Sequence, residues 1–237
     1  MIPAYLSYGV LKSSVRIEPR YPKDLEKLAL HIQQPQFPLA LRQFLYQHHY
    51  PDSENLPSHV ADCPPFAGKI NVHHSAVATF YSPSDLCGAG GMLRERVRSN
   101  PSFKGNPRRD TVFVVTDESQ PGMQGMVIAR VFLFFSFHYR HKDFSCAFVN
   151  WFIPHDTEQP DDDTGMWTVH PERNRRTGNL AYQVINVDSI ARGAHLLPVF
   201  GSQHVPEGFS HHNALDSYQS FFVNHYVDHH AHEFLTG

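Results

Sequence analysis

Four histidines and two carboxylates lie within eleven residues near the end of the chain, in the stretch NHYVDHHAHEF at 224–234. Zinc is bound by three or four imidazole, thiolate or carboxylate groups, and histidines four residues apart on a helix supply two of them. His225 and His229 have this spacing, and His232 follows three residues later. The H-E-x-x-H motif of zinc hydrolases is absent, because Asp228 directly precedes His229. These three histidines are therefore a candidate zinc site without a hydrolase motif.

The same histidines also suit a packing role on a C-terminal helix. Asn213 followed by Asp216 predicts a helix start, and residues then recur at helical spacing. The stripe consists of Leu215, Tyr218, Phe222, His225, His229 and His232. We expect it to face the body of the protein, with His230 pointing elsewhere and Asp228 and Glu233 toward solvent. Three interpretations stay open: a metal site, a packing seam and a pH-sensitive contact.

A second group of residues with chemical potential is basic. Residues 94–109 contain six cationic side chains against one acidic side chain, Glu95, a net charge of six minus one, or +5. The cations are Arg94, Arg96, Arg98, Lys104, Arg108 and Arg109. Because the whole chain carries a formal charge of −3, this cluster creates a local field that attracts phosphate, and Phe103 lies within it as a candidate stacking residue. The segment is either a nucleic-acid-binding face or a solvated basic surface.

Other motifs do not complete a catalytic site. The stretch CGAGGMLRERVR at 87–98 predicts a glycine-rich turn before a short basic helix, but it lacks the G-x-G-x-x-G and G-K-[ST] fingerprints of phosphate-binding loops. The acidic loop PDDDTG at 160–165 lacks the spacing of an EF-hand and is typical of a solvated turn. No G-x-S-x-G motif occurs, and Cys146 lies in an apolar run, where a thiol is typically inert. We therefore expect a protein that is not an enzyme.

The elements that must position these residues are helices followed by strands. Pro22 with KDLEKLALHI predicts a helix that begins at the proline, PLALRQFLYQHH at 38–49 predicts a second helix, and a proline-rich loop follows. Aromatic and β-branched runs then predict strands at 69–81, 110–115, 126–137, 144–152, 165–169 and 181–187. We predict an α+β fold with an antiparallel β-barrel-like core, N-terminal helices and a C-terminal helix. The expected units are a helical segment with its linker, 1–62, and a barrel-like domain, 63–237.

The run CAFVNWF indicates how the barrel wall is built. Its alternation places Cys146, Phe148, Asn150 and Phe152 on one face of a strand and Ala147, Val149 and Trp151 on the other. Because both faces are largely apolar, we expect both to be covered, with Phe148 and Trp151 buried.

Composition and the cysteine pattern indicate the compartment. Hydrophobic residues at 41% and charged residues at 18% are typical of a globular protein with a proper core. Three widely spaced cysteines do not predict a disulfide framework, and the N-terminus lacks the pattern of a secretory signal. The apolar run at 127–137 contains Arg130 and is shorter than the roughly 20 residues of a membrane-spanning helix. We expect an intracellular protein that does not enter a membrane.

Several longer blocks occur together in a recognisable order. They are FYSPSDLCGAGGMLRERVRSNPSFKGNPRRDTVFVVTD, GMQGMVIARVFLFFSF, DDDTGMWTV, IARGAHLLPVFG and FFVNHYVDHHAHEF. This succession, over roughly residues 40–237, resembles the C-terminal region of the long reading frames of fungal, chiefly basidiomycete, DNA transposons of the Plavaka and KDZ type. The blocks DTVFVV, MVIARVFLFFSF and CAFVNWFIP are also similar to strands of bromo-adjacent-homology-type domains, which are barrel-like chromatin readers.

The resemblance implies a non-catalytic interaction module, since neither the cysteine-rich zinc-binding part nor the transposase-like part of those frames can be mapped to this chain. It implies contact with nucleic acid or a chromatin protein, assembly with other transposon-encoded proteins, and a nuclear location. Two rival hypotheses stay open. In the first, His225 and His229, with Asp228 or His73, hold a divalent metal that activates water for phosphodiester hydrolysis. In the second, the barrel is a structural domain for protein assembly.

Overall fold

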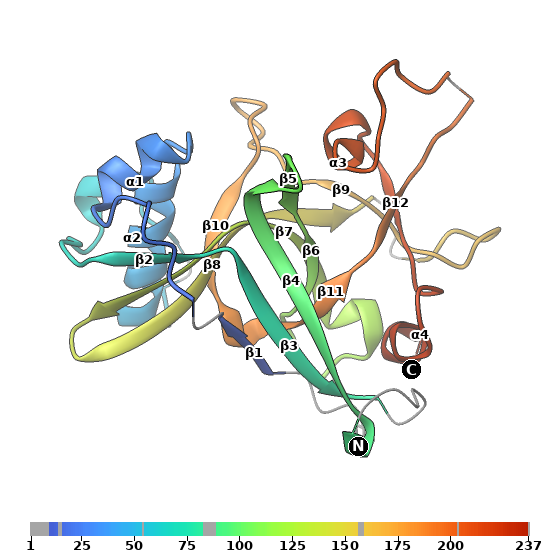
Figure 1. Cartoon of the computed structure of the whole chain (residues 1–237), viewed down its shortest axis with the longest axis horizontal. Helices are drawn as coiled ribbons and strands as arrows, with labels where there is room; N and C mark the ends of the chain where they lie inside the picture. Colours follow the sequence, from blue (N-terminus) through green and yellow to red (C-terminus); the bar gives the residue numbers. More distant parts are fainter. Residues whose placement is uncertain are drawn as a thin grey trace.

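The chain forms an α+β structure built mostly of strands. The computed structural model describes residues 10–13, 16–53, 55–82, 89–155, 159–202 and 204–236. In this part of the chain the strands are antiparallel and make a nearly closed, barrel-like sheet with few helices (Figure 1). The predicted fold class and barrel-like core are thus confirmed at this level. Within the described residues, no helix is long and apolar enough to cross a membrane.

The larger sheet is centred on two long strands, β7 (Met126–Tyr139) and β8 (Lys142–Pro154). Its order is β11-β6-β7-β8-β9-β13-β12, while β10 also pairs with β8 and β2 with β7. The bounds of the other strands are β2 Ile70–His73, β6 Thr111–Val115, β9 Thr168–Pro171, β10 Tyr182–Asn186, β11 Ile190–Ala194, β12 Leu196–Pro198 and β13 Phe221–Val223. The aromatic and β-branched runs of the sequence therefore supply the main strands of this sheet.

A smaller sheet has the order β1-β3-β4-β5. Its strands are β1 (Val10–Ser13), β3 (Ser75–Tyr81), β4 (Met92–Phe103) and β5 (Asn106–Arg109). The single strand predicted at 69–81 is thus divided at His74, and its two halves pair with different sheets. Between β4 and β5, Lys104 and Gly105 have φ angles of 53° and 91°, as expected for a two-residue hairpin turn that keeps the twist of its strands.

The short basic helix predicted after the glycine-rich loop is wrong, because Met92–Phe103 is a strand. The arginines and the more buried residues of this segment alternate with a period of two, which suits a half-covered strand and not a helix. Val97 and Ser99 are buried, whereas Arg94 and Arg96 are exposed. Pairing of β4 with β3 from Met92 to Arg98 fixes this register. Of the predicted glycine-rich turn, residues 87–88 lie outside the described residues, and Ala89–Gly91 form a 3-10 turn.

Two N-terminal helices pack against the larger sheet. In helix α1 (Leu25–His31), the Asp24 side chain caps the first turn by accepting from the Lys27 backbone N–H at 3.0 Å, so the helix begins after Pro22 and not at it. The second predicted helix is confirmed as α2 (Phe37–His49). The buried Phe37 ring lies 5.1 Å from Phe135 of β7 and 5.2 Å from Phe148 of β8. The helices therefore share a hydrophobic core with the barrel-like sheet.

Strand β8 separates two parts of the core, as its alternation predicts. Cys146 and Phe148 belong to the cluster under the helices, and Ala147 and Val149 belong to a second cluster on the opposite face. Phe148 is fully buried, which confirms the expectation for this residue. Trp151 is only partly buried, and its indole N–H donates to Gln183 Oε1 at 2.7 Å. The expectation of a buried Trp151 is corrected, because an indole with a polar partner can lie at the margin of a core.

The continuous C-terminal helix predicted from Asn213 is also wrong. The segment forms helix α3 (Ala214–Ser217), strand β13, and helix α4 (His229–Thr236). Phe221 and Val223 are buried on β13, which lies between β9 and β12, so sheet pairing overrides the helical spacing of this region. Short 3-10 turns, η1 to η4, occupy Val60–Asp62, Ala89–Gly91, Gly122–Gln124 and Val187–Ser189.

Candidate nucleic-acid interface

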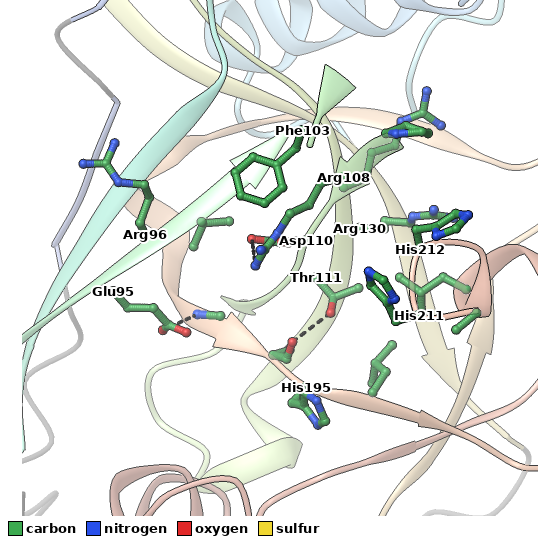
Figure 2. A pocket seen from close by; sticks show the side chains of 18 of the residues that line it. Glu95, Arg96, Phe103, Arg108, Asp110, Thr111, Arg130, His195, His211 and His212 are labelled. Atoms are coloured by element: carbon green, nitrogen blue, oxygen red, sulfur yellow. Dashed lines mark hydrogen bonds and ion pairs between the residues drawn. The ribbon is translucent and has the colours of Figure 1, made fainter. Parts of the chain in front are cut away.

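A cleft of about 820 Å³ lies between the β4–β5 hairpin and the C-terminal segment. Its floor includes residues of β6, β7 and β11, and residues that precede and begin α3 form part of its wall (Figure 2). The ionisable and imidazole side chains that line it are Arg96, Lys104, Arg108, Arg109, Arg130, Arg192, Glu95, Asp110, Asp228, His195, His211 and His212. Six cations against three carboxylates make the lining positive, six minus three, or +3. Such a concave basic surface concentrates anions.

At the hairpin side of the cleft, cations surround the Phe103 ring. The guanidinium carbons of Arg98 and Arg108 each lie 5.2 Å from the ring centre, and Lys104 Nζ lies 5.8 Å from it. These distances are within the range of cation–π attraction. Figure 2 shows the Arg108 side chain extending past the Phe103 ring toward Asp110. The aromatic ring and the basic side chains thus form one continuous polar and aromatic surface.

The Asp110 carboxylate holds this arrangement in place. Arg108 Nε donates to Asp110 Oδ1 at 2.7 Å, and Arg108 Nη2 donates to Oδ2 at 3.3 Å. The backbone N–H of Arg98 also donates to Oδ2, at 2.9 Å. Because the carboxylate accepts two hydrogen bonds from the guanidinium, it fixes the orientation of the guanidinium plane, which one hydrogen bond would not do. Asp110 therefore connects the start of β6 to both strands of the hairpin.

Arg130 of β7 is held at the cleft floor by Asp216. Arg130 is buried, with 6% of the residue exposed. Its Nη1 and Nη2 donate to the two carboxylate oxygens of Asp216, at 2.6 and 2.9 Å. The hydrogen bond from Arg130 lowers the pKa of Asp216 even though burial acts in the opposite direction. Arg109 stacks beside the pair, with its guanidinium 4.5 Å from the centre of the Phe132 ring. Burial, followed by the positive charge of Arg130, lowers the pKa of Arg109.

A second buried arginine, Arg192 of β11, joins the cleft to helix α4. It donates to Asp228 Oδ1 at 2.9 Å and to Oδ2 at 2.6 Å, and its Nη1 lies 2.8 Å from His230 Nδ1. Because arginine has no acceptor, this histidine nitrogen accepts the bond and carries no proton in this contact. Burial acts to raise the pKa of Asp228, but hydrogen bonds from Arg192 and from the Ala231 N–H outweigh it, so the pKa is lowered.

Glu95 is committed to the backbone of β11. Its Oε2 accepts from the Gly193 N–H at 3.0 Å, and its carboxylate lies 3.8 Å from Arg192 Nε. A Cβ on Gly193 would approach Glu95 Oε1 to 2.6 Å, so a side chain at this position would require the Glu95 carboxylate to shift. The single acidic side chain of the basic segment is therefore occupied by β11, and among the described residues it does not pair with the arginines of β4.

Several cations of the cleft lack an acidic partner within the part of the chain that the structure describes. Among the described residues, no carboxylate lies within ion-pair distance of Arg96, Lys104 or Arg109, whereas the three carboxylates of the lining all accept hydrogen bonds from the protein. In the same part of the chain, the Nε atoms of Arg130 and Arg192 are buried without a hydrogen-bond partner. Both atoms lie inside the protein and are closed to a ligand, so the cations that an anion in the cleft can reach are the exposed or half-buried ones of the hairpin.

The structure brings four of the six predicted basic residues to the cleft. These are Arg96, Lys104, Arg108 and Arg109. Arg94 is exposed on β4 outside the lining, and Arg98 contributes its contact with Phe103 and its backbone N–H. Sequence reasoning missed Arg130 and Arg192 as members of this surface. The signal for both was a single arginine within an otherwise apolar strand, in MVIARVF and SIARGA, because a charge in such a place is retained only with a partner.

The C-terminal histidines do not lie as predicted. His225 and His230 are buried, while His229 and His232 are exposed, so the expected orientation of the stripe is reversed for His229, His230 and His232. His225 and His232 approach each other with ring centres 5.3 Å apart, and burial followed by the proximity of His232 lowers the pKa of His225. Among the residues that the structure describes, no group of three or more histidine, cysteine, aspartate or glutamate side chains is placed to hold a metal ion.

His73 and Cys146, the two other residues considered for chemistry, both lie in surroundings typical of a structural role. Both ring nitrogens of His73 have partners at 3.0 Å, namely the Arg16 carbonyl and Ser136 Oγ. Cys146 is fully buried, and burial raises the pKa of its thiol far above the ordinary value, as expected for an unreactive cysteine.

Comparisons of the chain with protein-family models, with curated proteins and with solved structures found no match. The resemblance to transposon proteins, and the functions that it implies, therefore stay predictions.

Proposed function

We propose that this chain is a non-catalytic module that binds nucleic acid through the cleft beside the β4–β5 hairpin. The observation that carries the proposal is the concentration of cations, Arg96, Lys104 and Arg109, that have no carboxylate within ion-pair distance among the described residues, around a cleft that also contains the Phe103 ring. Phosphate contacts from such residues supply most of the affinity of sequence-independent nucleic-acid binding. The basic surface continues outside the cleft through the exposed Arg94, which suits an extended polyanion better than a small anion.

The resemblance to transposon proteins supports the same proposal. A transposon-derived accessory module would bind nucleic acid or chromatin in the nucleus, together with other transposon-encoded proteins. The finer fold proposed is a barrel of the bromo-adjacent-homology type, a suggestion based on the order of β6, β7 and β8 and on the VNWF ending of the β8 segment.

The hydrolase alternative has less support. It needs His225 and His229 to share a metal, yet one imidazole is buried and the other is exposed. The carboxylates of the cleft already accept hydrogen bonds from arginines or from backbone N–H groups, so they are not arranged as a carboxylate pair that holds a cation.

A protein-assembly role is a second candidate, because apolar side chains are exposed near the C-terminus. Phe200, Val205, Tyr226 and Val227 are 48%, 54%, 66% and 47% exposed. Phe200 also packs edge-on against Tyr218, with ring centres 5.2 Å apart. Exposed aromatic and aliphatic groups of this kind are enriched at protein interfaces.

The test is a salt titration of binding, followed by fluorescence anisotropy of labelled mixed-sequence oligonucleotides. Lys104→Ala/Arg109→Ala should weaken binding and reduce the slope of log K against log salt by about 1.4 for a single strand or 1.8 for a duplex, since each lost phosphate contact removes about 0.7 or 0.9. The matched control is Arg20→Ala/Arg140→Ala, which removes two exposed arginines that do not line the cleft. Absence of binding at low salt, or equal effects of the two double variants, would refute the proposal.

A further inference from the structure

We infer that the cleft accepts single-stranded nucleic acid and that one unpaired base stacks on a platform formed by Phe103 and Arg108. The inference rests on the proposed function and specifies its ligand. A protein that binds single strands without sequence preference combines a positive groove with flat groups on which bases stack, and both aromatic rings and guanidinium planes serve. The β4–β5 hairpin presents one of each at the same place, with Arg108 Cζ 5.2 Å from the Phe103 ring centre.

The platform is ordered before any ligand arrives. Asp110 holds the Arg108 guanidinium through Oδ1 at 2.7 Å and Oδ2 at 3.3 Å, and the same carboxylate accepts from the Arg98 backbone N–H. Phe103 is the last residue of β4 and directly precedes the tight turn at Lys104 and Gly105, so the backbone restricts its position. A stacking surface that is already fixed loses little side-chain entropy on binding. Asp110 is thus a positioning residue for Arg108.

The size of the cleft favours an unpaired strand. A volume of about 820 Å³ is that of a pocket for a ligand of nucleotide dimensions. The bases of a duplex are stacked on one another and cannot place a face against Phe103, whereas an unpaired base can. Lys104 in the turn and Arg109 at the end of β5 also line the cleft and, among the described residues, have no carboxylate within ion-pair distance. They are therefore available to the phosphates that flank the stacked base.

The first experiment separates the contribution of base stacking from that of phosphate charge by comparing three probes on the unchanged protein. Binding is measured for a twelve-residue oligothymidylate, for an abasic oligomer with the same length and charge, and for a duplex of equal length. The oligothymidylate should bind about tenfold more tightly than the abasic strand, which is the range expected for one stacked base. Phe103→Leu keeps an apolar side chain but removes the ring, and it should abolish most of the difference in affinity between the two single strands.

The second experiment uses Asp110→Asn, for which charge and positioning predict opposite results. The variant makes the cleft more positive by one unit, so a purely electrostatic surface should bind every probe more tightly. If Asp110 positions the platform, affinity for oligothymidylate should instead fall about threefold, while affinity for the abasic strand should stay level or rise. Thermal unfolding of both variants verifies their folding, and the probe comparison on the unchanged protein stands even where a variant fails to fold.

The outcomes distinguish this inference from the proposed function. If the unchanged protein binds oligothymidylate and the abasic strand with equal affinity, the platform is refuted but nucleic-acid binding is not. The same conclusion follows if Asp110→Asn binds both strands more tightly than the unchanged protein does. A duplex that binds more tightly than the single strand overturns the single-strand preference alone. Failure of all three probes to bind refutes the proposed function as well.

Discussion

Replacement of Asp228 by serine should destabilise the protein by about 2–3 kcal/mol, because it leaves a buried guanidinium without its main partner. The Arg192 side chain is 5% exposed, and it donates to both carboxylate oxygens of Asp228, at 2.9 and 2.6 Å, as well as to His230 Nδ1 at 2.8 Å. Removal of one member of a buried ion pair typically costs about 3–5 kcal/mol. The expected loss of stability is smaller here for two reasons. The Asp228 side chain is 31% exposed, and Glu95 lies 3.8 Å from Arg192 Nε as a second carboxylate.

Serine is chosen over alanine because Asp228 has a second role. Its Oδ1 accepts from the Ala231 N–H at 2.6 Å and so caps helix α4. A serine hydroxyl can retain this cap, whereas alanine removes it at a further cost of about 1 kcal/mol. The difference between the two variants therefore measures the cap, and the remaining loss measures the ion pair.

The assay is urea denaturation together with thermal unfolding. For a chain of this size, about 2–3 kcal/mol corresponds to a melting temperature lower by roughly 5–10 °C. Arg192→Met/Asp228→Ser removes both charges and should recover part of the loss seen with Asp228→Ser alone, since an apolar side chain does not need the missing partner. A loss below about 1 kcal/mol for Asp228→Ser, or a double variant as unstable as the sum of its single variants, would contradict the reasoning.

Three other results are expected. Phe148→Ala should cost about 3–5 kcal/mol in urea denaturation and Trp151→Ala clearly less, because the first side chain is fully buried and the second is partly exposed; equal losses would contradict this packing. The pKa of Asp216 is lowered in the folded state, so the stabilising contribution of this carboxylate is present above about pH 4 and is lost as the pH falls through the folded pKa. Between roughly pH 5 and 3, the melting temperature should therefore fall less for Asp216→Asn than for the unchanged protein. Elemental analysis after metal-free dialysis should find no stoichiometric zinc, and one zinc per chain that is lost on replacement of His225 and His229 by alanine would contradict that expectation.

The sequence by itself determined the elements whose residues satisfy their own local preferences. The runs of β6, β7 and β8 are long, aromatic and β-branched, and helix α2 has a strong apolar period, so both types could be predicted within a few residues. The basic character of 94–109 also follows from composition alone, as does the alternation of Cys146 to Val149 between two faces of a strand. These properties need no information about distant parts of the chain.

Tertiary structure alone decided the elements and contacts that depend on a distant partner. Met92–Phe103 becomes a strand because β3 pairs with it, and the helical spacing after Asn213 is broken because β13 inserts between β9 and β12. The cleft likewise joins Arg130 and Arg192, 62 positions apart (192 minus 130) in the sequence, to the β4–β5 hairpin. Sheet pairing and buried ion pairs are long-range interactions, and their free energy exceeds the small local differences between helix and strand propensity that sequence patterns measure.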